Sequence, residues 1–183
     1  ETDGPALSIR NKTKVKLILE GVNTLESTGG SNAGLFVEAG SSVVIECKNK
    51  DDADSLTATG GTGGAGIGGQ GSEPQGSITI KSGTINATGG KSAAGIGGGD
   101  FGPIGNITIT GGKITAQGGE GSFDTAGIRT YKSGAGIGYG GEATHDYALN
   151  SDEADDFAKV ILSGGEITAY GGADIVGQGT VYG

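Results

Sequence analysis

The amino-acid sequence predicts an all-β solenoid, in which short coils of chain stack on one another. The first observation is a repeat: the phrase ITIKSGTINATGG, which begins at Ile78, returns as ITITGGKITAQGG at Ile107, 29 residues later. The step from Ile67 to Ile96 has the same length. A fixed period of this size is typical of supersecondary units that stack in an array.

The second observation is the composition. The 183 residues include 42 glycines and three prolines, but four Phe, five Tyr and no Trp or Met. This supply of large side chains is poor for a conventional two-layer core. Because the glycines stand at fixed places in the repeat, they indicate corners between short segments. A solenoid needs only a few Ile, Val and Ala per coil, since each coil packs against its neighbours above and below.

The third observation is that apolar and polar residues alternate in short runs between glycine pairs, as in the segments 78–80 and 85–87. This period of two, with many β-branched residues, predicts strands, and the runs are too short for helices. Coil length varies from about 29 residues upward, which favours a right-handed helix over the hexapeptide-based left-handed one. The sequence therefore predicts a right-handed parallel β-helix of about five coils, with three short strands per coil.

The elements follow in order along one domain, which we expect to be part of a larger protein. Residues 1–14 form an N-terminal lead-in that includes a short strand at 6–10, and the coils occupy residues 15–179. Insertions at 120–133 and 141–157 fall at corners, where solenoids tolerate them. Equivalent residues should stack in columns: Ile78 over Ile107, Ile85 over Ile114, and Ile67, Ile96, Ile137 and Ile175 in one further column.

Charge and cysteine content exclude several classes of partner. The net charge of −9 argues against nucleic acid and anionic membrane surfaces, because both attract basic patches. No run approaches the ~18 apolar residues of a membrane-spanning helix, so we expect no membrane insertion.

The alternation from Val43 points Cys47 inward, as a small buried hydrophobic residue and not a nucleophile. A secreted protein without disulfides fits a bacterium.

The repeats carry a family resemblance. The phrases GGAGIGGQG, ITIKSGTINATGGKSAAGIGGG and ITITGGKITAQGG resemble the Gly-rich repeats of large secreted or wall-anchored proteins of Gram-positive, often gut-dwelling, bacteria. The likeness covers roughly residues 15–179. It implies a right-handed parallel β-helix, an extracellular location and, in some relatives, carbohydrate binding. No catalytic motif accompanies it.

Acidic clusters in two loops suggest calcium, since this hard cation prefers carboxylate and carbonyl oxygens. No other cofactor is expected. Neither cluster has the spacing of a known calcium loop, so solvated acidic loops are the alternative interpretation. The first cluster comprises Asp51, Asp52 and Asp54. The second, which we take as the candidate metal site, comprises Asp146, Asp152, Asp155 and Asp156.

Aromatic residues outside the repeat columns suggest glycan binding, because flat rings stack on sugar faces and tyrosine adds a polar tip. Most of them lie around the two insertions. The alternative is that these rings pack the insertions onto the coils. The candidate ligand-binding residues are Phe123, Tyr131, Tyr139 and Tyr147, and Phe101, Phe157 and Tyr170 are further rings outside the columns.

Three functional hypotheses remain open. The first is a non-catalytic binding module, an adhesin that binds a glycan or another host or plant surface polymer. The second is a rigid spacer in a surface protein, and the third is a small polysaccharide-active enzyme. The outward strand positions are neutral and the arginines are Arg10 and Arg129 alone, which argues against an enzyme. Adjacent domains of the parent protein and end-to-end self-association at the last coil are further expected contacts.

Overall fold

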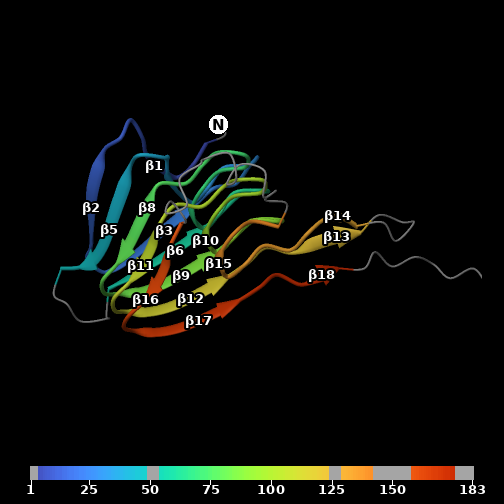
Figure 1. The fold of residues 1–183 in the computed structure, drawn as a ribbon. Coiled ribbons are helices and arrows are strands. Elements are labelled where there is room, and N and C mark those ends of the chain that lie inside the picture. The colour runs from blue at the N-terminus through green and yellow to red at the C-terminus, as the bar shows by residue number, and fades with distance from the viewer. Residues whose placement is uncertain (1–3, 49–53, 124–128, 142–157, 176–183) are drawn as a thin grey trace, which may run out of the picture.

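The fold is that of a right-handed parallel β-helix, as the sequence predicts. The computed structural model describes residues 4–48, 54–123, 129–141 and 158–175, and within these ranges the chain contains strands and no helix. None of the described residues therefore forms a helix that is long and apolar enough to span a membrane. Each full coil contributes one strand to each of three parallel sheets (Figure 1).

The chain visits the three sheets, which we call B, C and A, in the same order in every coil. Sheet B contains β2 (Lys14–Leu19), β5 (Ser42–Cys47), β8 (Ser77–Ile80), β11 (Ile107–Ile109) and β16 (Val160–Leu162). Sheet C contains β3 (Val22–Glu26), β6 (Ser55–Thr59), β9 (Thr84–Thr88), β12 (Lys113–Gln117) and β17 (Glu166–Tyr170). Sheet A contains β1 (Leu7–Ile9), β4 (Leu35–Val37), β7 (Ile67–Gly68), β10 (Ile96–Gly97) and β15 (Ile137–Gly138).

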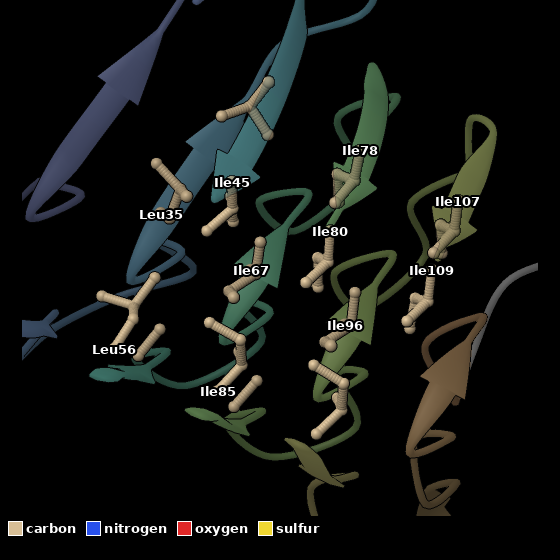
Figure 2. Close-up of a cluster of buried hydrophobic side chains, with 14 of the residues drawn as sticks. Leu35, Ile45, Leu56, Ile67, Ile78, Ile80, Ile85, Ile96, Ile107 and Ile109 are labelled. Atoms are coloured by element: carbon tan, nitrogen blue, oxygen red, sulfur yellow. The ribbon is translucent and has the colours of Figure 1, made fainter. Parts of the chain in front are cut away.

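The predicted columns of apolar residues are present. Ile78 pairs with Ile107 in sheet B, and Ile85 pairs with Ile114 in sheet C. Figure 2 shows such side chains repeating from coil to coil in the interior of the stack. Ile78, Ile85, Ile107 and Ile114 are each at most 1% exposed, because strand alternation turns them inward and neighbouring coils cover them. Cys47 is also buried, as predicted.

One predicted column is wrong at its last member. Ile67, Ile96 and Ile137 stack in sheet A, but Ile175 pairs with Ser122 and not with Ile137. The insertion at 120–133 explains the difference. It contributes β13 (Gly121–Phe123) and β14 (Arg129–Tyr131), which pair antiparallel, and β18 (Asp174–Ile175) adds to β13 in parallel. These three strands lie together beside the stacked coils (Figure 1).

Glycine is required at the corners because neighbouring backbones approach closely there. A Cβ atom on Gly90 would lie 1.8 Å from the carbonyl oxygen of Gly61 in the preceding coil. A Cβ on Gly118 would lie 2.1 Å from the carbonyl oxygen of Gly134. These contacts are far inside van der Waals distance, so the glycine pairs of the sequence set how tightly the chain turns.

Candidate binding site at a corner of the coils

The structure describes the predicted ligand-binding rings only in part. Tyr139 directly follows β15 and is 45% exposed. Phe123 and Tyr131 lie in the paired strands β13 and β14, but their side chains are outside the described part of the structure. Tyr147 also lies outside the described residues. The grouping of the four rings therefore stays a prediction.

The predicted calcium ligands, Asp146, Asp152, Asp155 and Asp156, all lie outside the described residues, as do Asp51 and Asp52. Within the described ranges, no group of three or more His, Cys, Asp or Glu side chains is arranged to hold a metal ion.

Asp54, by contrast, is described and does not belong to a solvated loop. It is 8% exposed, and its Oδ1 accepts a hydrogen bond from the backbone N of Gly21 at 2.7 Å. The interpretation of Asp54 as part of a solvated acidic loop is therefore wrong. Through this hydrogen bond, Asp54 connects the corner between sheets B and C of the second coil to the same corner of the first coil.

A pocket lies at a different corner of the coils, where the chain passes from sheet A to sheet B. We call it the corner pocket. It has a volume of about 240 Å³. Four successive coils contribute to it, so it runs along the stack and not around one coil. Its lining residues are Gly40, Gln75, Gly76, Ser77, Ile104, Gly105, Asn106 and Ala158.

The walls of the corner pocket are largely backbone. A Cβ on Gly76 would lie 2.3 Å from the carbonyl oxygen of Ser41, and one on Gly105 would lie 2.5 Å from that of Gly76. Side chains are therefore excluded at these two positions, and the space beside them stays open. None of the lining residues has an ionisable side chain.

Two amides supply the polar chemistry of the pocket. Gln75 is 4% exposed, and its Nε2 donates to the carbonyl oxygen of Gly76 at 3.0 Å, while its Oε1 is buried without a partner. Asn106 is exposed, and its Oδ1 accepts from the backbone N of Lys159 at 2.8 Å. The pocket thus offers the amides of Gln75 and Asn106 and the hydroxyl of Ser77 as its polar side chains.

Two exposed aromatic rings lie in the connections that lead from sheet A to sheet B. Phe101, 47% exposed, stands between β10 and β11 in the connection that also carries Ile104. Tyr139 occupies the position of Gly98 one coil later, because Gly97 pairs with Gly138. Neither ring lines the corner pocket. The backbone beside each ring bonds to a turn between sheets C and A, through Asp100 N–H to the carbonyl oxygen of Gly63 and Gly141 N–H to that of Ser92.

Sequence reasoning missed Gln75 and Asn106. A repeat signal exists for Asn106, because Gly76-Ser77 and Gly105-Asn106 share the pattern of a glycine and a small polar residue where a sheet B strand starts, 29 residues apart. Gln75 has no such signal, since Ile104 holds the corresponding place. Most of the aromatic residues outside the columns lie around the insertions, whereas the pocket lies on the regular coils.

Comparison with known proteins gives one match. Residues 78–100 and 107–128 each match a family model described as Beta helix repeat. The two matched segments begin at Ile78 and Ile107, which are register partners in successive coils of sheet B. No curated protein and no solved structure matches the chain. The matched repeats agree with the parallel β-helix that the described strands form.

Proposed function

We propose that this domain is a non-catalytic binding module of a secreted or wall-anchored bacterial protein, and that it binds a glycan at the corner pocket. The observation that carries the proposal is the lining of the pocket, which combines uncharged amides and a serine with open backbone. Protein sites for sugars need groups that exchange hydrogen bonds with hydroxyls, and they need no ionised side chain to do so.

The exposed rings support the same proposal. Phe101 and Tyr139 are each nearly half exposed in the connections from sheet A to sheet B, which also supply Ile104 and Asn106 of the pocket lining. An aromatic face can stack on the apolar face of a sugar ring while neighbouring amides bind its hydroxyls. A polymer that lies along the stack would contact several coils in turn, since the pocket itself spans four of them.

A spacer without a ligand is the second candidate. The regularity of sheets B and C favours it, because five strands in unbroken parallel register make a stiff rod-like body. A spacer has no use for exposed aromatic rings, and Phe101 and Tyr139 are the reason for placing binding first.

The test is a binding assay of the purified domain on immobilised polysaccharides, carried out in calcium and again in EDTA. We expect retention on at least one polymer, and loss of retention when Phe101 and Tyr139 are replaced together by alanine. Sensitivity to EDTA would add calcium to the proposal, through the acidic residues of the insertion at 141–157.

Tyr170 provides the matched control. It is 55% exposed, more than either test residue, but it ends β17 in sheet C and does not belong to a connection between sheets A and B. Tyr170→Ala should leave retention unchanged. Retention by no polymer in either buffer would contradict the proposal and favour the spacer, and equal losses for the Tyr170 variant would move the site away from the corner.

A further inference from the structure

We infer that the corner pocket takes a sugar that carries an acetamido group, and that Asn106 binds this group by donating a hydrogen bond from its side-chain amide to the acetyl carbonyl oxygen. The inference rests on the proposed function, because it names the class of glycan that the same pocket would take. Two observations carry it, the orientation of the Asn106 amide and the apolar residues beside it.

The orientation of the Asn106 amide is fixed by the next coil. The backbone N–H of Lys159 donates to Asn106 Oδ1 at 2.8 Å. A backbone N–H can only donate, so the amide oxygen has to be the atom on that side. The Nδ2 atom, with its two N–H donors, is on the other side of the same planar group. The polar atom of this side chain that remains for a ligand is therefore a donor.

Asn106 stands on the outer surface of the coils, at the wall of the pocket. It directly precedes β11, and its neighbour Ile107 is fully buried, so strand alternation turns Asn106 outward. It is exposed and belongs to the pocket lining. Ser77 holds the equivalent outward position one coil earlier, because Ile78 pairs with Ile107. An amide donor and a hydroxyl therefore lie on neighbouring strands, within reach of one sugar unit.

Apolar side chains complete the lining near Asn106. Ile104 lies two residues before it, and Ala158 directly precedes Lys159, whose N–H holds the amide. Both residues line the pocket and both are partly exposed. An acetamido group carries a carbonyl oxygen and a methyl group on one carbon atom. The oxygen can accept from the amide while the methyl group contacts the apolar lining, whereas a hydroxyl has no apolar part.

The charges around the pocket favour a neutral acceptor over a carboxylate. None of the lining residues is ionisable, so the lining has no cation to pair with an acidic sugar. Lys159 meets Asn106 through its backbone N–H, and Lys12 approaches the wall through its stem, since a Cβ on Gly40 would lie 3.1 Å from Lys12 Cγ. The net charge of −9 adds a general repulsion against acidic polymers.

The size of the pocket fits one unit of a polymer. Its volume of about 240 Å³ is below the range of about 300 to 1,000 Å³ that is usual for sites that enclose a whole small molecule. One substituted sugar ring would enter the pocket, and the neighbouring units would lie along the stack. A polymer with an acetamido group on each ring presents the required group in any register.

The experiment compares two soluble oligosaccharides that differ in one substituent of each ring. Chitohexaose carries an acetamido group where cellohexaose has a hydroxyl, and each is titrated into the intact chain in a calorimeter. Chitohexaose should bind at least about tenfold more tightly, because only its substituent supplies both the carbonyl acceptor and the methyl group. This comparison needs no variant and so does not depend on any change in folding.

Variants then assign the preference to one residue. Asn106→Asp keeps an oxygen for the N–H of Lys159 and replaces the Nδ2 donor by an acceptor, so it should weaken chitohexaose binding at least about tenfold. The control is Asn86→Asp, which makes the same change of charge at an exposed asparagine of β9 in sheet C. That variant should bind as wild type does. Circular dichroism would verify that both variants keep the fold.

The outcomes separate the two proposals. Cellohexaose binding as tight as that of chitohexaose, or chitohexaose binding that is unchanged in Asn106→Asp, would overturn the role of Asn106 and leave the binding module standing. Retention of the domain on other polysaccharides without any binding of chitohexaose would do the same. Failure of wild type to bind either hexamer or any immobilised polymer would overturn the proposed function as well.

Discussion

The two ends of the stack bury their apolar residues very differently. At the N-terminal end, Ile9 and Leu19 are 4% and 2% exposed, although they belong to outermost strands. At the C-terminal end, Val160 is 42% exposed and Leu162 is 53% exposed. Leu162 pairs in register with Ile109, which is fully buried. At the C-terminal end, a position that is core in the neighbouring coil is thus exposed at the surface.

A polar residue accounts for part of the difference. Asn23 stands in the inward column of sheet C, in register with Leu56, where later coils have isoleucine. Its Nδ2 lies within hydrogen-bond distance of the carbonyl oxygens of Glu20, Gly21 and Ser55. Ile167 holds the corresponding place in the last described coil. The first coil therefore closes its end with an amide, and the last coil presents an apolar side chain.

The largest expected effect concerns one glycine position in two coils. Gly118 and Gly171 each follow a sheet C strand, and their preceding residues, Gln117 and Tyr170, are register partners. A Cβ would lie 2.1 Å from the carbonyl oxygen of Gly134 in the first case and 3.8 Å from it in the second. Gly118→Ala should cost at least about 3 kcal/mol through overpacking, and Gly171→Ala about 0.5 kcal/mol.

Urea denaturation monitored by circular dichroism measures both values. If the two variants lost equal stability, close packing would extend to the C-terminal end and the contrast between the ends would fail. A Gly118 variant as stable as wild type would show that the corners can widen to accept a methyl group.

The next effect tests the core column directly. Ile109→Ala removes a fully buried side chain and should cost about 2–5 kcal/mol, because the neighbouring coils cannot close the cavity completely. Leu162→Ala, at the paired position, should cost about 1 kcal/mol or less, since half of that side chain is already exposed. The same denaturation experiment applies. A large loss for the Leu162 variant would mean that the last coil is covered in solution.

Much of this fold is predictable because a solenoid repeats one sequence pattern in each coil, so every repeat supports the same prediction. The pairing of Ile78 with Ile107 and of Ile85 with Ile114 follows from spacing alone, since strands one period apart must stack in register. Ile175 was not predictable in this way. The insertion before it contributes strands of its own, and hydrogen bonding to Ser122 replaces the regular partner. Periodicity contains no information about a segment that interrupts it.

The candidate site was less predictable than the fold. Tyr139 was recognisable as an aromatic residue outside the columns, and it is exposed as expected for a binding residue. Gln75 gave no such signal, because it lines the pocket only when several coils meet at one corner. The residues of those coils are far apart in sequence.

A smaller effect should follow from removing the polar end of the first coil. Asn23→Ala deletes the amide that reaches three carbonyl oxygens, and it should cost about 1 kcal/mol. Thr24→Ala is the control, since Thr24 is the exposed neighbour on the outward side of the same strand, and it should change the unfolding free energy little. Equal values for the two variants would show that Asn23 does not act as a cap.

The smallest effect concerns ion pairs near the two ends. Glu46 lies 3.0 Å from Lys16 Nζ and 3.7 Å from Lys81 Nζ, and the hydrogen bond from Lys16 lowers the pKa of its carboxyl group. At the other end Glu166 lies 3.3 Å from Lys113 Nζ, its one ion-pair partner among the described residues, and its side chain is 71% exposed. Glu46→Gln should therefore lower the melting temperature slightly at neutral pH, and Glu166→Gln should lower it less.

The pH dependence provides the test of this last contrast. Because folding lowers the pKa of Glu46, the carboxylate stabilises the fold fully above the pKa of the unfolded state, and this contribution is lost as the pH falls through the folded pKa. Melting curves of wild type and Glu46→Gln should thus differ at pH 7 and converge in acid. They should also converge in high salt, which screens exposed charges. A difference that persists in acid would show that Glu46 stabilises the stack by packing and not by charge.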